Sequence, residues 1–579
     1  MISSDVHQIS PTEPSQLKAL ATSAEPARPA YDSLVAALEA SARDDEPYLT
    51  LYLGKEPTRI TARAALEGAR RQASLLHRCG VKKGDRVVVL TPTSPLFVET
   101  FFGANLLGAV PVPLASPMTF GGLGRYLQNL ASIIENSEAR VIVTSQRMKE
   151  AIAQEEGLRE RLQHVLCESD VLDGNVASPA LTSISASDSA FIQYTSGTTG
   201  KPKGAVISHR ALLSNTSAIA RALRLTRDDH VVSWLPLFHD MGLIGVLLTT
   251  ICHPAHVHII RPEAFLMKPS RWIELISQHK GTLAAAPNFA YDLCVSRAKS
   301  EQEVRLDSWR AALNGAEAVY PTTVSRFIEH YADKGISPEV MMPVYGMAES
   351  TLAITFPKLD NKYQTLSVDR ALLDQRGKAA ASTSADAYIA VSVGYPVAAT
   401  SVRVTGSNSQ AVDERIVGEI MVKSPSLMDG YFHNEKATSE TISDGWLHTG
   451  DLGFMDNGRL FVVGRAKEVI IKGGRNIYPY DVEQIASEVS GVHHGGVAAF
   501  ARPNPTTGTD DLVVMAETRE KDPELRERIV KEIRGELLAA LSVKVDDVQL
   551  GAVGSLPRTT SGKIRRRECA LQSAQKQNS

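Results

Sequence analysis

Short runs of apolar, often β-branched residues alternate with helix-period segments over most of the chain. Continuous apolar runs predict buried strands, and apolar residues that recur every three or four positions predict amphipathic helices. The predicted strands are Arg86–Leu90, Val141–Val143, Ala190–Tyr194, Val231–Leu235, Val257–Ile260 and Leu283–Ala286, and the predicted helices include Leu34–Ala42 and Ala64–Cys79. This alternation is typical of an α/β fold with mixed and largely parallel sheets.

After Gly464 the pattern changes to a compact α+β arrangement with a long amphipathic helix. Asp522 is expected to cap this helix and Pro523 to open it. Its expected apolar face holds Leu525, Ile529, Val530, Ile533, Leu537, Leu538 and Leu541, and the expected strands before it are Gly496–Phe500 and Leu512–Ala516. We therefore predict a large, multi-subdomain domain over residues 31–466 and a small, mobile domain over residues 467–579.

The two ends of the chain are expected to lie outside the packed domains. Residues 1–30 are polar and proline-rich, which predicts a disordered tail and not a signal peptide or a membrane anchor. The residues after Ala570 are expected to fray. The longest apolar run, Met241–Cys252, is too short to cross a bilayer, so no transmembrane segment is expected. It predicts a buried helix instead.

Composition narrows the class of protein. A chain of 579 residues is too long for one core, and a net charge of −3 gives no overall bias toward nucleic acid, so no nucleic-acid partner is expected. The five cysteines are scattered, with no pair at metal-ligand spacing, which fits a reducing cytoplasm.

The segment from Tyr194 to Gly204 combines glycines, hydroxyls and lysines directly after a predicted strand. Glycines let the backbone approach a phosphate, amides and hydroxyls donate to its oxygens, and lysines offset its charge. The segment differs from a P-loop, because Pro202-Lys203-Gly204 stands where that motif requires Gly-Lys-Ser/Thr, so that proline replaces the glycine and glycine replaces the hydroxyl residue. We therefore predict a phosphate-binding loop of another kind and exclude the P-loop NTPases.

Further motifs follow this loop in a fixed order. They are Trp234–Gly242 (Trp-Leu-Pro-Leu-Phe-His-Asp-Met-Gly), Asn314–Glu317, Tyr345–Thr351, Trp446–Asp451, Gly464–Glu468, Lys472–Pro479 and Pro557–Lys563. With them, residues 31–567 resemble the acyl-adenylate-forming enzymes. Phe238–Gly242, Ala286–Cys294 and Tyr345–Glu349 look most like a fatty acyl-AMP ligase.

Residues 352–393 stand where that branch carries an insertion associated with loss of CoA use. The polar run Lys378–Ala385 within them predicts an exposed, mobile portion. A plain surface-loop elaboration is the alternative, since long loops are tolerated at low cost.

The resemblance implies a reaction of a carboxylate with ATP that yields an acyl-adenylate and pyrophosphate, with Mg²⁺ as a second cofactor. It also implies roles for individual residues. Lys563 would bridge the carboxylate and the α-phosphate, His239 would lie near the carboxylate, and Glu349 would hold the metal. The implied ATP- and AMP-binding residues are Thr195, Ser196, Gly197, Thr198, Thr199, Lys203, Gly315, Ala316, Glu317, Tyr345, Gly346, Met347, Asp451 and Arg465, and Lys467 would be the hinge between the domains.

Without the family resemblance, several of these residues could have a purely structural role. Glu349 could lie on the surface, and Tyr345 and His239 could belong to the core. A run of basic residues is usually a solvated face, which predicts solvent exposure for Arg566 and Arg567, where they could meet an acidic carrier protein.

The resulting hypothesis is a fatty-acid adenylating ligase that passes its acyl group to the phosphopantetheine thiol of a separate acyl carrier protein. A separate carrier is expected because too few residues follow Lys563 to form one. Polyketide, non-ribosomal peptide or lipid biosynthesis would use such a product. The alternatives are a fatty acyl-CoA ligase and, less favoured, a non-catalytic acyl-adenylate-binding homologue.

Overall fold

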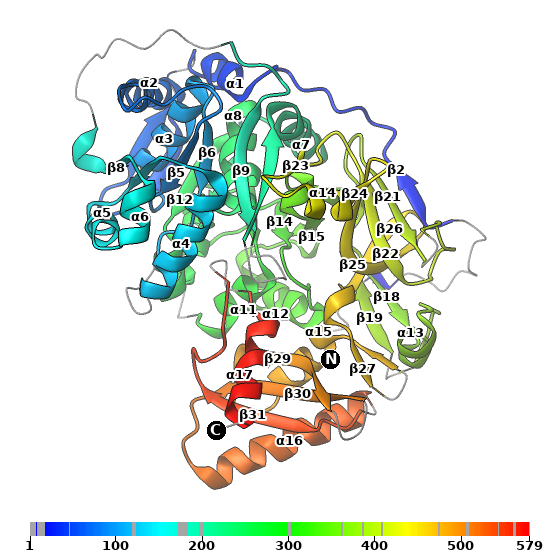
Figure 1. The fold of residues 1–579 in the computed structure, drawn as a ribbon. Helices are drawn as coiled ribbons and strands as arrows, with labels where there is room; N and C mark the ends of the chain where they lie inside the picture. Colours follow the sequence, from blue (N-terminus) through cyan, green and yellow to red (C-terminus); the bar gives the residue numbers. More distant parts are fainter. Residues whose placement is uncertain are drawn as a thin grey trace.

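The structure is a computed structural model that describes residues 7–8, 18–43, 45, 47–117, 123–171, 183–195, 202–298, 303–359, 363–384, 387–406, 409–472, 475–504, 509–541, 543–559 and 563–577. Figure 1 shows a large body that contains most of the chain and a smaller unit, orange to red, packed beneath it. We call the elements up to β26 the large domain and those from β27 onward the small domain.

The largest sheet in the described residues has seven strands in the order β15-β14-β13-β11-β12-β3-β4. Neighbouring strands are parallel except for the β3–β4 edge, as expected for strands buried on both faces. The strands are β3 (Pro47–Tyr52), β4 (Thr58–Thr61), β11 (His230–Ser233), β12 (His256–Ile260), β13 (Leu283–Ala286), β14 (Ala311–Asn314) and β15 (Met341–Pro343). The predicted strands in this region are confirmed.

Alternate residues of these strands enter two different cores. Val231 packs with the helices on one face, and Val232 packs with those on the other. The helices of the first face are α1 (Leu34–Ser41), α7 (His209–Ala222), the π-helix η2 (Met241–Leu248) and α8 (Thr249–Cys252), and those of the second are α10 (Ser270–Gln278), α11 (Asn288–Ser296) and α12 (Pro321–Tyr331). The predicted buried helix at Met241–Cys252 is thus present as η2 and α8.

A second parallel sheet, in the order β6-β5-β7-β8, lies beside the first. Helices α2 (Ala62–Arg78) and α3 (Pro95–Leu106) pack their apolar sides on its core. Its other elements are β5 (Arg86–Leu90), β6 (Val110–Pro113), α4 (Leu123–Ser137), β7 (Val141–Thr144), α5 (Gln146–Ala153), α6 (Glu156–Arg161) and β8 (His164–Leu166). The predicted strands at Arg86–Leu90 and Val141–Val143 are confirmed here.

Antiparallel sheets complete the large domain and carry residues of the later motifs. One has the order β2-β21-β22-β25-β24, with β26 paired to β25, and another has the order β23-β10-β9. The strands are β2 (Leu20–Thr22), β9 (Ser189–Thr195), β10 (Lys203–Ser208), β21 (Ser401–Thr405), β22 (Gly418–Lys423), β23 (Gly430–Tyr431), β24 (Ile442–Ser443), β25 (Trp446–Asp456) and β26 (Arg459–Arg465). Strand β9 ends at Thr195, β25 contains Asp451 and β26 ends at Arg465, so these sheets carry predicted site residues from distant parts of the chain.

The small domain has a three-stranded sheet, β29-β30-β31, within the described residues. Strand β29 faces two cores: Val497 and Ala499 pack under α15 and α16, while Ala498 and Phe500 pack with Ile564 and Cys569. The elements are β27 (Ile470–Lys472), β28 (Arg475–Ile477), α15 (Pro479–Ser487), β29 (Val492–Asn504), β30 (Thr509–Thr518), α16 (Pro523–Leu541), β31 (Asp547–Ala552) and α17 (Arg566–Gln577).

The expected disordered tail is wrong for residues 18–30 and for strand β1 (His7–Gln8), which pairs with β18 (Gln364–Val368). Strand β2 pairs with β21 along the edge of a sheet, and Ala19 beside it is fully buried. Glu25 accepts hydrogen bonds from Arg221. A polar composition hid these contacts, because a single short edge strand needs few apolar residues.

Helix α16 begins at Pro523 with Asp522 as its cap, as predicted, since the Asp522 carboxylate accepts from the backbone N–H of Glu524 at 2.8 Å. Leu525 and Leu538 are wrong as members of the buried face, with exposed fractions of 38% and 56%. The expected fraying after Ala570 is also wrong, because α17 continues and buries Ser573 against Gln549 and Arg502.

Residues 352–393 form structure and not one open loop. They contain β17 (Ala353–Phe356), β18 (Gln364–Val368), α13 (Arg370–Arg376) and β19 (Tyr388–Val391). Within the polar run, Ala379 is fully buried and its N–H donates to the Arg415 carbonyl at 2.8 Å. The expectation of an exposed portion therefore holds only in part: Thr383 and Ser384 are exposed, and residues 385–386 lie outside the described residues.

Candidate active site

A cavity of about 3200 Å³ opens where the large and small domains meet. It lies beyond the carboxyl ends of the parallel strands, where loops of an α/β sheet commonly bind ligands. The predicted site residues that line it are Thr195, Lys203, His239, Ala316, Glu317, Tyr345, Gly346, Met347, Glu349, Asp451, Arg465, Lys467 and Lys563. Ser196, Gly197, Thr198 and Thr199 lie outside the described residues.

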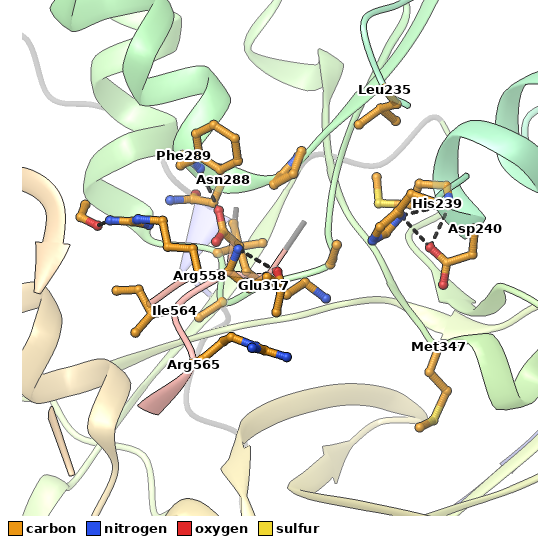
Figure 2. Close-up of a pocket in the computed structure, with 18 of the residues that line it drawn as sticks. Leu235, His239, Asp240, Asn288, Phe289, Glu317, Met347, Arg558, Ile564 and Arg565 are labelled. Carbon is orange, nitrogen blue, oxygen red and sulfur yellow. Dashed lines mark hydrogen bonds and ion pairs between the residues drawn. The ribbon is translucent and has the colours of Figure 1, made fainter. Parts of the chain in front are cut away.

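His239 and its neighbour Asp240 form one side of the cavity (Figure 2). Nδ1 of His239 lies 2.7 Å from Oδ1 of Asp240, and the same oxygen accepts from the N–H of Met241 at 2.7 Å. Burial raises the pKa of Asp240, but attraction to His239 and Lys563 outweighs burial, so that pKa lies below 3.8. Asp240 is thus a fixed negative charge that orients the imidazole.

Gln193 supports this loop from strand β9 by donating to the Phe238 carbonyl at 3.0 Å. Sequence reasoning missed Gln193, because a glutamine inside a predicted strand gives no sign of which loop it will contact.

Glu317 lies across the cavity from His239, beside Arg558 of the small domain (Figure 2). Its Oε1 accepts from the N–H of Phe289 at 2.7 Å, at the start of helix α11. Burial raises the pKa of Glu317, while Phe289, Lys563 and Arg558 oppose the rise. Ala316 precedes it at a φ of +68°, so the turn after β14 is strained at a residue other than glycine.

Gly315 starts this turn and does not itself line the cavity. A side chain there would meet the Val344 carbonyl oxygen at 2.9 Å, so the motif's glycine keeps two strand ends close together. Gly346 is held more tightly still, because an added Cβ would lie 1.9 Å from the Leu352 carbonyl oxygen. This contact fixes the positions of Tyr345 and Met347 on either side.

Asp451 contacts both Tyr345 and Arg465 in the cavity. The Tyr345 hydroxyl donates to Oδ2 of Asp451 at 2.7 Å, and Nε of Arg465 forms an ion pair with Oδ1 at 2.9 Å. Asp451 and Arg465 are direct cross-strand partners of β25 and β26, which explains their pairing. Burial and the Asp451 carboxylate raise the pKa of Tyr345, so its hydroxyl remains a donor.

Glu349 is partly exposed to the cavity and accepts from the Tyr431 hydroxyl at 2.7 Å. The Lys203 ammonium lies 4.9 Å from the centre of the Tyr431 ring. Tyr431 is on β23, which pairs with β10 next to Lys203. Sequence reasoning missed Tyr431, because a tyrosine after a glycine in a short strand carries no motif.

Lys563 lines the cavity from the segment before α17. Burial lowers the pKa of Lys563 below 10.5, and the nearby Arg465 lowers it further. The carboxylates of Asp240, Glu317 and Asp451 act in the opposite direction and raise this pKa. The ammonium therefore interacts electrostatically with residues from four separate motifs. The backbone of Lys563 is held by Thr559, whose N–H donates to the Lys563 carbonyl at 2.7 Å.

The environment of Arg566 differs from the predicted solvent exposure. Its side chain is only 10% exposed and forms ion pairs with Glu483 at 2.6 Å and with Glu468 at 2.7 Å. Its guanidinium also lies 4.2 Å from the centre of the Tyr480 ring. The predicted solvent-facing role is therefore wrong for Arg566, since acidic partners from other parts of the chain balance its charge. Lys467, beside Glu468, is exposed.

Helix α13 of the 352–393 segment contacts the small domain through two reciprocal ion pairs. Arg370 lies 3.5 Å from Asp481, and Asp374 accepts from Arg475 at 2.8 Å. Each domain thus contributes one cation and one anion to the contact. This segment therefore forms part of the boundary that also encloses the cavity.

Comparison with known proteins agrees with this architecture. Residues 38–432 match the family described as AMP-binding enzyme. The chain belongs to the AMP-binding enzyme family. As a member of that family the protein is an ATP-using, adenylate-forming enzyme. The fold class expected from the sequence is thereby confirmed, including the small carboxyl-terminal domain.

Several named relatives align with most of this chain. It is 32% identical to the long-chain-fatty-acid–AMP ligase FadD26 of Mycobacterium marinum, over 84% of this chain and 86% of that one. It is 31% identical to the medium-chain-fatty-acid–[acyl-carrier-protein] ligase JamA of Moorena producens, over 85% and 86%. It is also 35% identical, over 84% and 85%, to a Caulobacter vibrioides protein designated a candidate acyl-CoA synthetase.

A solved structure from work on the fatty acyl-adenylate ligases of E. coli and L. pneumophila superposes with a TM-score of 0.88. It shares 32% identity and covers 95% of this chain and 99% of its own. Within the described residues, no helix is long and apolar enough to cross a membrane.

Proposed function

We propose that the protein activates a fatty acid with ATP to give an acyl-adenylate and pyrophosphate, and then transfers the acyl group to the phosphopantetheine thiol of a separate acyl carrier protein. The observation that carries the first half is that the Lys563 ammonium shares one cavity with His239, Glu349 and the Asp451–Arg465 pair. Relatives named as a long-chain-fatty-acid–AMP ligase and a medium-chain-fatty-acid–[acyl-carrier-protein] ligase support a fatty acid as the substrate.

The first step requires a carboxylate to attack the α-phosphorus while the bond to pyrophosphate breaks. Both reactants are anionic, so the protein must offset their repulsion and hold them in line. Lys563 is suited to neutralise the carboxylate and α-phosphate oxygens together, because it is a compact charge on a flexible stem. His239, oriented by Asp240, is suited to bind the carboxylate.

Asp451 is suited to bind the ribose. Each carboxylate oxygen accepts more than one hydrogen bond, so the contacts with Tyr345 and Arg465 leave room for the ribose hydroxyls. The Tyr345 ring would then lie against the adenine, and Glu317 and Ala316 would line the adenine side.

Glu349 fits a magnesium ion held jointly with substrate. Among the residues that the structure describes, no group of three His, Cys, Asp or Glu side chains could hold a metal ion. Mg²⁺ commonly takes one or two carboxylates and completes its shell with substrate phosphates and water. Bound there, the ion would offset charge on the transferring phosphates.

The acyl side of the cavity is apolar. Its wall includes Leu235, Met241 and Val246 near His239, and Leu283 and Leu313 of the parallel strands. Such a wall favours a hydrocarbon chain over a polar amino-acid side chain.

Two candidates exist for the thiol that accepts the acyl group: an acyl carrier protein and free CoA. JamA, whose name specifies an acyl carrier protein, supports the carrier, whereas the Caulobacter relative favours CoA. The segment 352–393 supports the carrier, because it resembles the insertion associated with loss of CoA use.

Product analysis by mass spectrometry tests both halves. Purified enzyme is given ATP, Mg²⁺ and fatty acids of increasing length, with no acceptor, with free CoA, or with a phosphopantetheinylated carrier protein. Acyl-AMP that persists with CoA and is consumed with carrier is the expected result. Rapid acyl-CoA formation would assign the enzyme to the CoA ligases, and the absence of pyrophosphate release with every fatty acid would refute the proposed substrate.

A further inference from the structure

A histidine and an aspartate join the two domains beside the cavity. Nε2 of His494, on strand β29 of the small domain, lies 3.0 Å from Oδ1 of Asp292, on helix α11 of the large domain. The Asp292 side chain is 9% exposed and that of His494 is 42% exposed. Both residues line the cavity. Figure 1 shows the boundary at which α11 and α12 face the small domain.

The Asp292 carboxylate is held in place by a residue of its own domain. Arg326 of helix α12 donates to the same oxygen of Asp292 at 2.9 Å, and Arg326 belongs to the large domain. The carboxylate therefore stays paired and in place when the small domain moves, so only the His494 contact depends on the domain arrangement. A fixed partner lowers the entropy cost of forming the second ion pair.

The surroundings of His494 favour its protonated form. Its hydrogen bond to Asp292 raises the pKa above 6.5, burial and Arg326 lower it, and the Ser487 carbonyl of helix α15 supports the rise. The groups that face the imidazole are thus one carboxylate, one guanidinium and one backbone carbonyl. An imidazolium donates from both ring nitrogens, which suits two acceptors.

The position of His494 is mechanically linked to that of Lys563. His494 precedes the part of β29 in which Ala498 and Phe500 pack against Ile564, the residue after Lys563. Arg558 adds a link, because its guanidinium donates to the Gly495 carbonyl at 2.7 Å. A packed core transmits displacement, so docking His494 onto Asp292 sets where Lys563 lies.

We propose that His494 is a positioning residue that, as an imidazolium paired with Asp292, holds the small domain in the arrangement that presents Lys563 to the reacting groups. This inference rests on the proposed function only for the identity of the reaction. Release of His494 is then required before the small domain turns to the acyl-transfer arrangement.

The His494–Asp292 pair makes the docking of the small domain depend on pH. Because the pKa of His494 is raised by docking, the stabilisation is fully present below the pKa of the undocked residue and is lost as the pH rises through the docked pKa. Higher pH therefore disfavours adenylation relative to acyl transfer.

Three variants test the proposal. His494→Gln removes the charge, His494→Arg keeps a charge that does not titrate, and His330→Gln is a matched change on α12 away from the cavity. The rate of pyrophosphate release with fatty acid and ATP, and the rate of acyl transfer from preformed acyl-AMP to a carrier protein, are measured between about pH 5 and about pH 8.

For His494→Gln we expect adenylation to slow about fivefold or more at the low end of this range, with the KM for ATP unchanged and acyl transfer unimpaired. For His494→Arg we expect the rate to be restored and its pH dependence to be flattened. His330→Gln should match the parent. The proposal is overturned if His494→Gln has the rate and pH profile of the parent enzyme.

A second readout separates this proposal from the assigned reaction. Energy transfer between one fluorophore on each domain reports docking without any substrate. A parent protein that docks at low pH and a His494→Gln variant that does not would support the contact even if no fatty acid releases pyrophosphate. Identical energy transfer in the two proteins at every pH would overturn it.

Discussion

The Tyr345 hydroxyl donates a 2.7 Å hydrogen bond to Oδ2 of Asp451 across 106 positions of sequence. The bond leaves the carboxylate fixed between the tyrosine and Arg465, whose Nε is 2.9 Å from the other oxygen. The contacts therefore hold the aromatic ring and the carboxylate in a constant relation, as the proposed nucleoside site requires.

Tyr345→Phe should weaken nucleotide binding while leaving the fold intact. A hydrogen bond to a charged group contributes about 1.5–3 kcal/mol, so we expect the Kd for ATP to rise about tenfold. Isothermal titration measures this change. Tyr363→Phe is the matched control, because its buried hydroxyl has no hydrogen-bond partner among the described residues and its loss should leave the Kd unchanged. Equal affinity in Tyr345→Phe and the parent would contradict the assigned role of the pair.

Tyr431→Phe should change the response to magnesium. The hydroxyl orients the Glu349 carboxylate from 2.7 Å, and partners of metal ligands typically alter metal affinity by about tenfold or more when removed. We expect the Mg²⁺ concentration for half-maximal pyrophosphate release to rise about tenfold, with the rate at saturating Mg²⁺ nearly retained. An unchanged magnesium curve would argue against Glu349 as the ligand.

Lys563→Ala should abolish acyl-AMP synthesis and leave ATP binding within about twofold, since losing one preorganised charge contact typically costs about a hundredfold or more in rate. In the parent, the lowered pKa of Lys563 means that its charge is lost at a lower pH than that of a free lysine. The adenylation rate should therefore decline on the alkaline side before the ordinary pKa of 10.5 is reached. Lys531→Ala, on the exposed face of α16, is the control.

Asp481→Asn should alter domain docking in acid. Burial raises the pKa of Asp481 from 3.8 to about 7 despite Arg370 at 3.5 Å. The docked arrangement binds the proton more tightly than the undocked one, so docking gains stability as the pH falls from about 7 toward 3.8 and loses it as the pH rises through about 7. Energy transfer between the domains should therefore depend less on pH in Asp481→Asn.

His494 favours docking in the same direction as Asp481, so a pH profile alone does not separate them. The double variant Asp481→Asn, His494→Arg should lose nearly all pH dependence of docking. Full dependence in that protein would point to a different titrating group at the boundary.

Truncation at the amino terminus tests the ordered part of the tail. Deleting residues 1–25 removes β2 and the buried Ala19, and strand pairs contribute about 0.2–1 kcal/mol each. We expect activity to be retained but the thermal midpoint to fall by about 2–4 °C. Deleting residues 1–17 removes the two-residue strand β1 but leaves β2 in place, so it should lower the midpoint less. Equal midpoints in the two proteins would show that β2 adds no stability.

Local patterns predicted much of the fold. The strands from Arg86–Leu90 to Leu283–Ala286 and the helix at Pro523 were found where apolar periodicity and capping placed them. The predictions were wrong where contacts with distant parts of the chain decide whether a residue is buried. Ala19 stands in a polar stretch of sequence yet is buried beside β21, and Arg566 is cationic yet buried by Glu468 and Glu483. Neither set of partners could be identified from residues nearby in the chain.

By itself, the sequence determined the family, the order of the motifs and the residue types able to bind phosphate, ribose and metal, because these depend on local chemistry and spacing. Only the tertiary structure decided the pairs Tyr345–Asp451, Tyr431–Glu349 and His494–Asp292. The physical reason is that such contacts form between residues far apart in sequence, and they exist only after sheet pairing and domain docking have determined which side chains share one enclosed space.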